Sequence, residues 1–454
     1  MKVLLVWPPN PDYCVLNEDF SICEPLGLEY IAASLLSSHD VEMLDMRFDD
    51  GLERKLSTEV FDAVGIAVPF TTSINTCNRL LRRVHAHDPT IIKLIGGHYP
   101  STSLSKIDLR YVDYAISGEG VHATRDLLSA VAAGREVRHI PGVVAIEDGV
   151  PHHGPRQPKI DLDACPLPAR HLLSQHREQY FHAHYNPIAL MRFSVGCPFD
   201  CSFCILWKMT DRQYITRSND SILAELQSIE SGNVYVVDDE AFIQVPRMSA
   251  LADDIIRSGI RKRFHMYVRS DTIARNPALF EKWAEAGLDS VLVGLESVFP
   301  DELADYKKKI SLHVARECVK VLHGNGVEVR ANFIVRPDYT VDKFRRVREI
   351  VSELDIDRPT FAVLTPFLGT DTYEELKDDL ILDEPELYDC YHTLMKTKLP
   401  LRTFYKEFAD LFRSAQRRGE RGDSSKVFYA GKGDSFDNFV EKIETSHRFY
   451  EPHE

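Results

Sequence analysis

The sequence predicts an α/β protein in three consecutive parts: an N-terminal doubly wound (Rossmann-like) domain, a partial (β/α)6 barrel and a C-terminal helical region. A chain of 454 residues is too long for one ordinary core, so more than one domain is expected. Short apolar runs alternate with helical patterns in the first third of the chain, and the alternation returns after residue 187. Strands that alternate with helices fold through right-handed crossovers into parallel sheets.

The first third of the chain supplies the elements of the doubly wound domain. Strands are expected at Val3–Val6, Val41–Met46, Val64–Val68, Ile91–Ile95 and Tyr114–Ile116. Helices are expected at Leu26–Ser37, Asn75–Ala86 and Ala123–Ala133. Ligands of such sheets bind outside the carboxyl ends of the strands, so the loops at those ends are the candidate site.

Those loops contain glycines, which let a ligand approach the backbone, and hydroxyl groups, which can hydrogen-bond it. No G-x-G-x-x-G motif occurs, which disfavours a nicotinamide or flavin dinucleotide. The spacing alone therefore indicates a nucleotide- or cofactor-binding type of fold without choosing the ligand. The candidate binding residues are Pro8, Thr71, Thr72, Gly96, Gly97, His98, Gly118 and Glu119.

A proline-rich connector follows this domain. Val143–Val150 predicts a small hairpin that turns at Asp148-Gly149, and five prolines between Pro151 and Pro168 argue against regular structure after it. The expected organisation is a first domain at 1–135, a linker at 136–186, a barrel at 187–377 and a C-terminal helical region at 378–454.

The barrel is predicted from six strand-and-helix units. Its strands are expected at Ala189–Phe193, Val234–Val237, His265–Val268, Ser290–Val293, Val329–Val335 and Phe361–Leu364. Its helices are expected at Asp220–Ser231, Arg247–Ile260, Pro277–Ala286, Leu312–Asn325 and Val341–Leu354. The active site of such a barrel lies at the carboxyl ends of the strands.

Three cysteines follow the first barrel strand in a C-x-x-x-C-x-x-C array: Cys197, Cys201 and Cys204. A [4Fe–4S] cube held by three cysteines keeps one iron for an exogenous ligand. Structural zinc normally takes four protein ligands, and a disulfide would leave one thiol over. The array therefore favours an iron–sulfur cluster. The other six cysteines are scattered and are expected to be small buried residues: Cys14, Cys23, Cys77, Cys165, Cys318 and Cys390.

With an aromatic residue, Phe203, before its last cysteine, the array resembles the radical S-adenosylmethionine (SAM) superfamily. The resemblance implies that the open iron chelates SAM, whose reductive cleavage yields a 5′-deoxyadenosyl radical, and that Phe203 packs near the adenine. It also implies that polar residues at the ends of further strands contact SAM, although each could equally be structural. Asp238, Asp239 and Glu240 lie in the segment that would receive the amino group, Arg269 would pair with the carboxylate, and Glu296 would accept from the ribose or amine.

The first domain carries a second resemblance. K-V-L-L-V-W-P-P, I-G-G-H-Y-P-S and I-S-G-E-G occur in the order seen in the cobalamin-binding domain that precedes many radical SAM domains. The D-x-H-x-x-G motif, whose histidine ligates cobalt in many cobalamin proteins, is missing. His98 is the only histidine in a plausible loop, and we expect a loop role for it rather than cobalt ligation.

Two later segments, Phe333–Thr340 (F-I-V-R-P-D-Y-T) and Tyr391–Phe408, are most similar to the hopanoid C-3 methylase subgroup. This implies a cobalamin-dependent radical SAM methyltransferase that acts on an unactivated carbon of a lipid or secondary metabolite. Ring closure, or transfer of another SAM-derived group, is an alternative. A cobalamin-sensing module is disfavoured by the intact cysteine array, and a transfer-RNA methylthiotransferase would want a further cysteine triad and a basic terminal domain.

Composition and charge narrow the partners. The formal net charge of −15 would repel a polyanion, so no nucleic-acid partner is expected. No apolar run approaches the roughly 20 residues that span a bilayer, and the apolar start ends in Pro8-Pro9, which fits a buried strand better than a signal peptide. We therefore expect a cytoplasmic enzyme with a small-molecule or lipid substrate, an electron donor such as flavodoxin or ferredoxin, and transient membrane contact at most.

The C-terminal region is expected to be helical from Tyr388 to Phe412, with an interruption at Leu399-Pro400. Arg417–Lys426 is charged and glycine-rich, and we expect it to be mobile. In radical SAM enzymes that carry an N-terminal cobalamin-binding domain, such a C-terminal region covers the mouth of the barrel. That makes Tyr391, His392 and Tyr405 candidate substrate neighbours, although packing on an amphipathic helix is an equally good interpretation.

Overall fold

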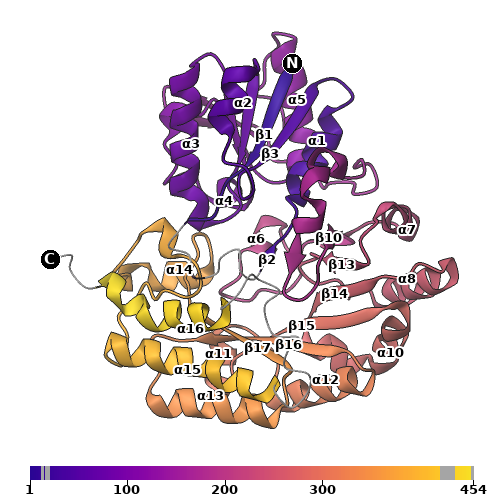
Figure 1. Cartoon of the computed structure of the whole chain (residues 1–454), viewed down its shortest axis with the longest axis vertical. Helices are drawn as coiled ribbons and strands as arrows, with labels where there is room; N and C mark the ends of the chain where they lie inside the picture. The colour runs from indigo at the N-terminus through magenta and orange to yellow at the C-terminus, as the bar shows by residue number, and fades with distance from the viewer. Residues whose placement is uncertain (12–14, 16–20, 420–434, 451–454) are drawn as a thin grey trace. The chain divides into compact units, whose positions relative to one another are not determined.

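The computed structural model describes residues 1–11, 15, 21–419 and 435–450, and the chain divides into two compact units (Figure 1). The first unit consists mainly of Glu24–Arg177 together with the N-terminal strand. The second consists mainly of Glu178–Asp383 and the residues from Leu387 onward, and it includes the short strand β2 (Ser21–Ile22). The fold class predicted from the sequence is confirmed, because each unit contains a parallel sheet whose strands are joined by helices.

The first unit is built on a seven-stranded sheet with the strand order β3-β1-β4-β5-β6-β7-β8. All five predicted strands are present and pair in parallel: β1 (Lys2–Trp7), β3 (Asp40–Asp45), β4 (Ala63–Ala67), β5 (Ile92–Gly96) and β6 (Tyr114–Ile116). Its helices are α1 (Leu26–Leu35), α2 (Leu52–Thr58), α3 (Ile74–His87), α4 (His98–Thr102) and α5 (Gly120–Ala132). The short helices α2 and α4 were not predicted.

The predicted hairpin is also present, and it extends this sheet. Strand β7 (Val143–Glu147) pairs antiparallel with β6, and β8 (Val150–His153) pairs antiparallel with β7. Asp148 and Gly149 have φ values of +51° and +77°, the left-handed conformation that a tight hairpin turn requires. The 3₁₀ segment η3 (Arg170–Gln179) follows later in the connector.

The second unit is built on a six-stranded, all-parallel sheet with the order β10-β13-β14-β15-β16-β17. Its strands confirm the six predicted ones: β10 (Ile188–Met191), β13 (Asn233–Val236), β14 (Arg263–Val268), β15 (Leu288–Glu296), β16 (Glu328–Val335) and β17 (Arg358–Val363). The predicted helices correspond to α7 (Asn219–Ser228), α8 (Val245–Ser258), α10 (Pro277–Ala286), α12 (Leu312–Gly324) and α13 (Val341–Glu353).

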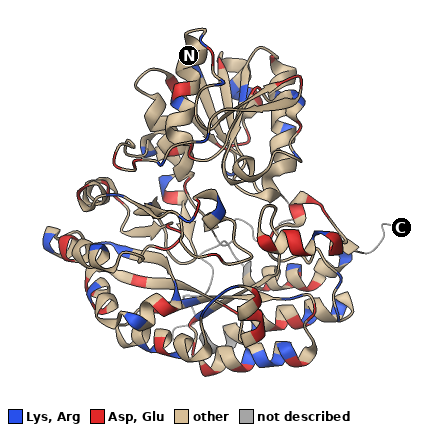
Figure 2. Cartoon of the chain, turned by 180° about the vertical axis from the view of Figure 1, so that it is seen from behind, with Lys and Arg blue, Asp and Glu red and all other residues tan. Residues whose placement is uncertain are grey.

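The main core of this unit lies between the strands and their helices. Side chains alternate across a strand, and on β14 the outward-facing Phe264 and Met266 are fully buried in this core. Trp283 of α10 meets the ring of Phe264 edge-on at 5.8 Å. The outer helices carry charges of both signs, as Figure 2 shows, so neither sign dominates their surface.

The C-terminal region differs from the prediction at its start. Residues 388–400 contain no helix: Cys390 has a φ of +67°, which a right-handed helix does not allow, and the carboxylate of Asp389 accepts hydrogen bonds from the backbone N–H groups of Tyr391 and His392. The helical prediction for this stretch is wrong. Helix α15 (Leu401–Gly419) begins directly after Pro400, and α16 (Ser435–Thr445) packs against it.

Three further expectations concern this region. Tyr391 packs in the core beside Phe439, with ring centroids 5.5 Å apart, and Tyr405 shares a hydrogen bond of 2.8 Å with Tyr450. The packing interpretation of these two residues is therefore the better one. Most of Arg417–Lys426 lies outside the described residues. None of the described helices combines the length and apolar character needed to cross a bilayer.

Candidate functional site

The three cysteines of the array lie on one loop of the second unit. Strand β11 (Ser194–Val195) pairs antiparallel with β12 (Ile215–Thr216), and the intervening loop carries Cys197, Cys201 and Cys204. Because β11 follows β10 by only two residues, the loop starts at the carboxyl end of the first barrel strand. This is the end of the sheet where barrel enzymes place their active sites.

The segment that leads into this loop is fixed by the acidic residues after β13. Asp238 accepts a hydrogen bond of 2.7 Å from the backbone N–H of Phe193 and another from the hydroxyl of Ser194. Asp239 accepts one of 2.8 Å from the N–H of Gly196, directly before the first cysteine. Both oxygens of Asp238 are thus engaged by the chain itself.

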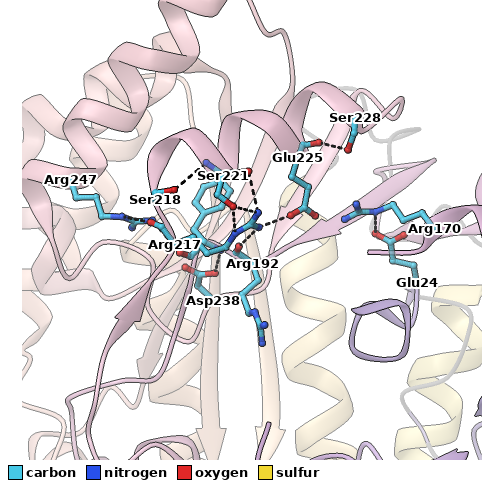
Figure 3. A network of polar contacts seen from close by, with 11 residues as sticks. Glu24, Arg170, Arg192, Arg217, Ser218, Ser221, Glu225, Ser228, Asp238 and Arg247 are labelled. Atoms are coloured by element: carbon cyan, nitrogen blue, oxygen red, sulfur yellow. Dashed lines mark hydrogen bonds and ion pairs between the residues drawn. The ribbon is translucent and has the colours of Figure 1, made fainter. Parts of the chain in front are cut away.

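Two arginines fix the same segment from its other side (Figure 3). Arg217 forms a buried ion pair with Glu225 of α7 and donates a hydrogen bond of 3.0 Å to the carbonyl of Arg192. Arg247 donates one of 3.1 Å to the carbonyl of Phe193. The lead-in strand is therefore held by charged side chains on both sides.

The electrostatics of the thiols suit an inorganic cluster. Burial raises the pKa of Cys197 to about 11 and that of Cys204 to about 12, and the neighbouring thiols and acidic residues add to the effect. Such thiols become thiolates only beside a strong positive charge, which cluster iron supplies. In a [4Fe–4S] cube held by three cysteines, each thiolate would bind a different iron.

Glu240 and Arg269 lie at the ends of the next two strands. One carboxylate oxygen of Glu240 accepts a hydrogen bond of 2.7 Å from the backbone N–H of Arg269, while Oε1 is buried and has no hydrogen-bond partner within the described residues. Burial raises the pKa of Glu240 to about 7. The guanidinium of Arg269 lies 3.7 Å from the ring centroid of Phe199 in the cysteine loop, and its Nε donates to Asp271.

Glu296 ends β15 in a strained conformation. Its φ of +63° is rare for a residue with a side chain, and such strain collects at functional sites. Its carboxylate accepts a hydrogen bond of 2.7 Å from Lys308, and both side chains are buried. A Cβ on Gly294 would lie 2.2 Å from Oε1 of Glu296 and 2.7 Å from the Nζ of Lys308, so a larger residue there would displace the ends of both side chains.

The loop that carries Lys308 is bonded to the cysteine loop. Ser202 donates from its backbone N–H to the carbonyl of Tyr306 at 3.2 Å and from its hydroxyl to the carbonyl of Asp305 at 3.0 Å. The rings of Phe203 and Tyr306 meet edge to face at 5.5 Å. The buried hydroxyl of Tyr306 has no partner within the described residues.

The candidate residues of the first unit lie where predicted, at the carboxyl ends of its strands. Thr71 and Thr72 form the buried 3₁₀ turn η1 (Thr71–Ser73) after β4, and Pro8 follows β1. Gly96 ends β5, and Gly97 has a φ of +124°, where a Cβ would lie only 2.6 Å from the carbonyl oxygen of Val68.

The loop after β6 is fixed by a side-chain amide. Gln157 accepts a hydrogen bond of 2.7 Å from the N–H of Glu119 and returns one of 2.8 Å to its carbonyl, while the N–H of Gly118 donates to Ser101 of α4. Gly97, His98 and Gly118 are exposed. The loops therefore offer backbone that an amide-rich cofactor such as cobalamin can contact.

The structure groups the predicted SAM residues around the cysteine loop and also brings in residues that the sequence analysis missed. Lys308 and Tyr306 are the main additions, and both lie in a lysine-rich turn that the sequence analysis did not single out. The sequence did contain a signal for these two residues, because the turn lies between the strand that ends in Gly294 and Glu296 and the helix that follows it. Asp238 holds the segment that leads into the cysteine loop. Among Asp238, Asp239 and Glu240, the buried carboxylate oxygen without a hydrogen-bond partner in the described residues is Oε1 of Glu240.

Comparison with known proteins adds independent findings. The radical SAM superfamily pattern matches residues 191–351, and the B12 binding domain pattern matches residues 14–128. The hopanoid C-3 methylase of Methylococcus capsulatus is 31% identical over 415 residues, which cover 90% of this chain and 78% of that protein. The anaerobic magnesium-protoporphyrin IX monomethyl ester cyclase of Rubrivivax gelatinosus is 25% identical and covers 77% of this chain and 64% of its own length.

Solved structures share the fold. The radical SAM methyltransferase TsrM from Kitasatospora setae, with tryptophan and a SAM analogue bound, superposes with a TM-score of 0.71 at 15% identity and covers 99% of both chains. The cobalamin-dependent radical SAM enzyme OxsB gives a TM-score of 0.73 at 16% identity, over 99% of this chain and 72% of its own. At these identities the likeness concerns the fold alone.

The two domain patterns, the fold and the methylase relative agree with the chemistry of the cysteine loop. The cofactors of this chain are a [4Fe–4S] cluster, SAM and cobalamin, and enzymes of its type need a reductant and act on small substrates. On these findings the chain belongs to the cobalamin-dependent radical SAM methyltransferase family.

Proposed function

We propose that this enzyme methylates an unactivated carbon of a lipid or secondary metabolite, with Cys197, Cys201 and Cys204 as the ligands of its cluster. The observation that supports this most is the loop that carries three cysteines, Cys201 buried and the other two partly buried, at the carboxyl end of the first barrel strand. When bound, the cluster and SAM supply a 5′-deoxyadenosyl radical and cobalamin supplies the methyl group. The protein positions these groups and excludes water.

The SAM site is proposed from groups that still have bonds to make. The free Oε1 of Glu240 would accept the SAM amino group, and Arg269 would hold the carboxylate, because its two terminal nitrogens make no hydrogen bond within the described residues. Glu296 would accept from the ribose, and Lys308 keeps the charge of that buried carboxylate balanced. Phe203 would pack beside the adenine.

The cobalamin site is proposed at the loops of the first unit, within residues 1–135, and the radical domain within residues 187–377. His98 is exposed and opens the short helix α4, and we infer that it does not ligate cobalt. His98→Ala should leave the electron paramagnetic resonance spectrum of protein-bound cob(II)alamin unchanged. Loss of a nitrogen-ligated pattern in that variant would contradict the inference.

The relatives bear on the acceptor. By its name the Methylococcus protein acts on a hopanoid, which supports a lipid acceptor, while the cyclase relative favours ring closure as the second candidate. We place the enzyme in the cytoplasm with flavodoxin or ferredoxin as its electron donor and no nucleic-acid partner. Contact with a membrane would be transient, when a lipid acceptor is taken up.

The test needs no knowledge of the acceptor. Reconstituted protein with cobalamin, SAM and reduced flavodoxin should release about one S-adenosylhomocysteine per bound cobalamin, because methyl transfer to cobalt consumes one SAM. Cys201→Ala should abolish 5′-deoxyadenosine formation and spare this release, and Cys318→Ala, in helix α12, should change neither. A cyclase would give 5′-deoxyadenosine without S-adenosylhomocysteine, and that outcome would refute methyl transfer.

A further inference from the structure

The inner face of the barrel sheet is polar and partly open to solvent. On β14, β16 and β17 the inward-facing Tyr267, Asn332 and Thr360 keep some exposure to solvent, whereas their outward neighbours along each strand are buried in the core. Because side chains alternate strictly across a strand, this pattern means that the interior of the barrel remains accessible above its floor. A barrel built for a bare hydrocarbon would line this face with aliphatic side chains.

The floor is closed by a short two-stranded ribbon from the same unit. Strand β9 (Phe181–His182) pairs with β2, and His182 stacks on the rings of Tyr235 and His265 at centroid distances of 4.9 and 5.2 Å. The Nε2 of His182 lies 2.9 Å from Nη1 of Arg330, and its Nδ1 lies 3.1 Å from the hydroxyl of Ser21. Since a guanidinium only donates, His182 accepts at Nε2 and is neutral.

His265, at the same floor, has one ring nitrogen without a hydrogen-bond partner in the described part of the chain. Its Nδ1 lies 2.6 Å from the hydroxyl of Ser290, which also receives a hydrogen bond from Tyr185. Its Nε2 is buried and has no partner within the described residues. Burial, followed by the charge of Arg330, holds the pKa of His265 well below its usual range, so Arg330 is the cation of this floor.

Arg330 is a buried charge for which the described part of the chain provides no counter-charge. Its side chain is on the inner face of β16, the residue is 8% exposed, and its Nε has no hydrogen-bond partner within the described residues. Within the described residues no carboxylate lies within ion-pair distance of it: Glu328, two residues earlier on the same face, has its Oε2 2.9 Å from Nε of Arg358, and its Oε1 makes no hydrogen bond. An uncompensated buried charge is strongly destabilising, so such an arginine points to an anionic ligand.

We propose that Arg330, together with His265, binds an anionic oxygen group, a carboxylate or a phosphate monoester, at one end of the methyl acceptor. Guanidinium forks match such groups better than any other side chain does. Arg330 lies five residues before Val335 at the carboxyl end of β16, which places the floor about 16 Å below the mouth. The acceptor is therefore an elongated acid whose far end reaches the cofactors, and this deepens the proposed function on which it rests.

The first test uses binding alone, so it is independent of methyl transfer. Full-length reconstituted protein is titrated calorimetrically with octanoate, octyl phosphate, methyl octanoate and 1-octanol. At least one anion should bind tenfold or more tightly than the ester and the alcohol. Arg330→Gln should remove this difference in affinity and leave the affinity for the ester unchanged. Arg263→Gln, which alters an exposed arginine already paired with Asp289, should retain it.

The pair of anions separates the two sources of the ligand group, since preference for octanoate indicates a carboxylic acid and preference for octyl phosphate a phosphorylated alcohol. Equal binding of anions and neutral analogues by the wild-type protein, or an anion preference that survives in Arg330→Gln, would overturn the proposal. S-adenosylhomocysteine release, measured on the same preparations, reports separately on the proposed function.

The second test distinguishes a ligand-binding arginine from a structural one. Without ligand, Arg330→Met should unfold within a few degrees of the wild-type protein, because removal of the unpaired buried charge offsets the loss of the hydrogen bond to Nε2 of His182. Whichever anion binds should raise the unfolding temperature of the wild-type protein and not that of the variant. A marked loss of stability in ligand-free Arg330→Met would show that Arg330 supports the fold and would refute the proposal.

Discussion

The two units place their candidate sites at the same end of a parallel sheet but fix the loops there by different means. In the second unit, buried charged side chains hold the cysteine loop and its surroundings: Arg217 with Glu225, Asp238 with the lead-in strand, and Glu296 with Lys308. In the first unit the loops after β5 and β6 are held by backbone conformation and neutral amides, as at Gly97 and at the pairing of Gln157 with the backbone of Glu119.

The difference matches the ligands. A cluster bound by three thiolates of one loop requires that loop to hold a single geometry. Paired charges can hold it, because they form directional bonds in a buried setting. A large cofactor bound through many weak contacts needs close access to backbone, which glycines provide and charges would obstruct. The comparison predicts that charge changes are costly in the second unit and that added side-chain volume is costly in the first.

The largest effect is expected from the cysteines themselves. Alanine at Cys197, Cys201 or Cys204 should abolish the iron–sulfur absorbance and all 5′-deoxyadenosine formation, because three ligands are the fewest that hold such a cube. Iron content and absorbance after anaerobic reconstitution measure this. Cys77→Ala, which alters a buried thiol in α3 of the first unit, should keep the full iron content. A cluster retained in the triple variant would contradict the ligand assignment.

Next in size is the buried ion pair behind the lead-in strand. Arg217→Met leaves the carboxylate of Glu225 buried without its partner, which should cost about 3–5 kcal/mol in the free energy of unfolding of the second unit. Urea unfolding and iron content should both report it. The double variant Arg217→Met/Glu225→Leu should recover part of the stability, and no recovery would mean that the hydrogen bond from Arg217 to the carbonyl of Arg192 carries the effect instead.

In the first unit the matching experiment adds one methyl group. Gly97→Ala combines a φ of +124° with a Cβ only 2.6 Å from a carbonyl oxygen, so it should cost about 1–3 kcal/mol locally and weaken cobalamin binding by tenfold or more. Absorbance titration of the full chain with hydroxocobalamin measures this. Gly27→Ala, in α1 with no atom within 4 Å of its new Cβ, is the control and should bind normally.

The sequence was sufficient for the sheets because each strand is a short apolar run bounded by turn residues. It failed at Tyr388–Leu399, where spacing indicated a helix but Cys390 adopts a left-handed φ of +67°. The conformation of this turn depends on tertiary structure, since the carboxylate of Asp389 accepts from the N–H groups of Tyr391 and His392 and also from that of Val15.

In the candidate site, too, the residues set by local sequence were predicted and those set by tertiary structure were not. The cysteines were found because all three lie within eight residues, and the partners of Glu296 and Phe203 were missed because Lys308 and Tyr306 reach them through a loop bonded at Ser202. Arg330 was overlooked because a single arginine between valine and alanine looks like an ordinary strand position. Its inward orientation, which is what gives it meaning, comes only from the register of β16 with its neighbours.

The smallest effect is expected at Asp238, where the contribution of the negative charge can be separated from that of the hydrogen bonds to Phe193 and Ser194. Burial raises the pKa of Asp238 from 3.8 to about 6 in the folded protein. A raised carboxyl pKa means that the folded state holds a proton between pH 4 and 6 that the unfolded chain releases, so this group stabilises at low pH and the contribution is lost as the pH rises through 6. The slope is at most about 1.4 kcal/mol per pH unit.

Asp238→Asn tests this, because its amide keeps the clamp: Oδ1 can still accept from the N–H of Phe193, and Nδ2 can donate to the hydroxyl of Ser194. Urea midpoints of the two proteins should therefore show the wild-type advantage shrinking from pH 4.5 to 7, with equal iron content after reconstitution. An advantage that grows with pH would mean that the donors stabilise the carboxylate more than burial penalises it. Loss of iron from the asparagine variant would show that the negative charge itself holds the cysteine loop in place.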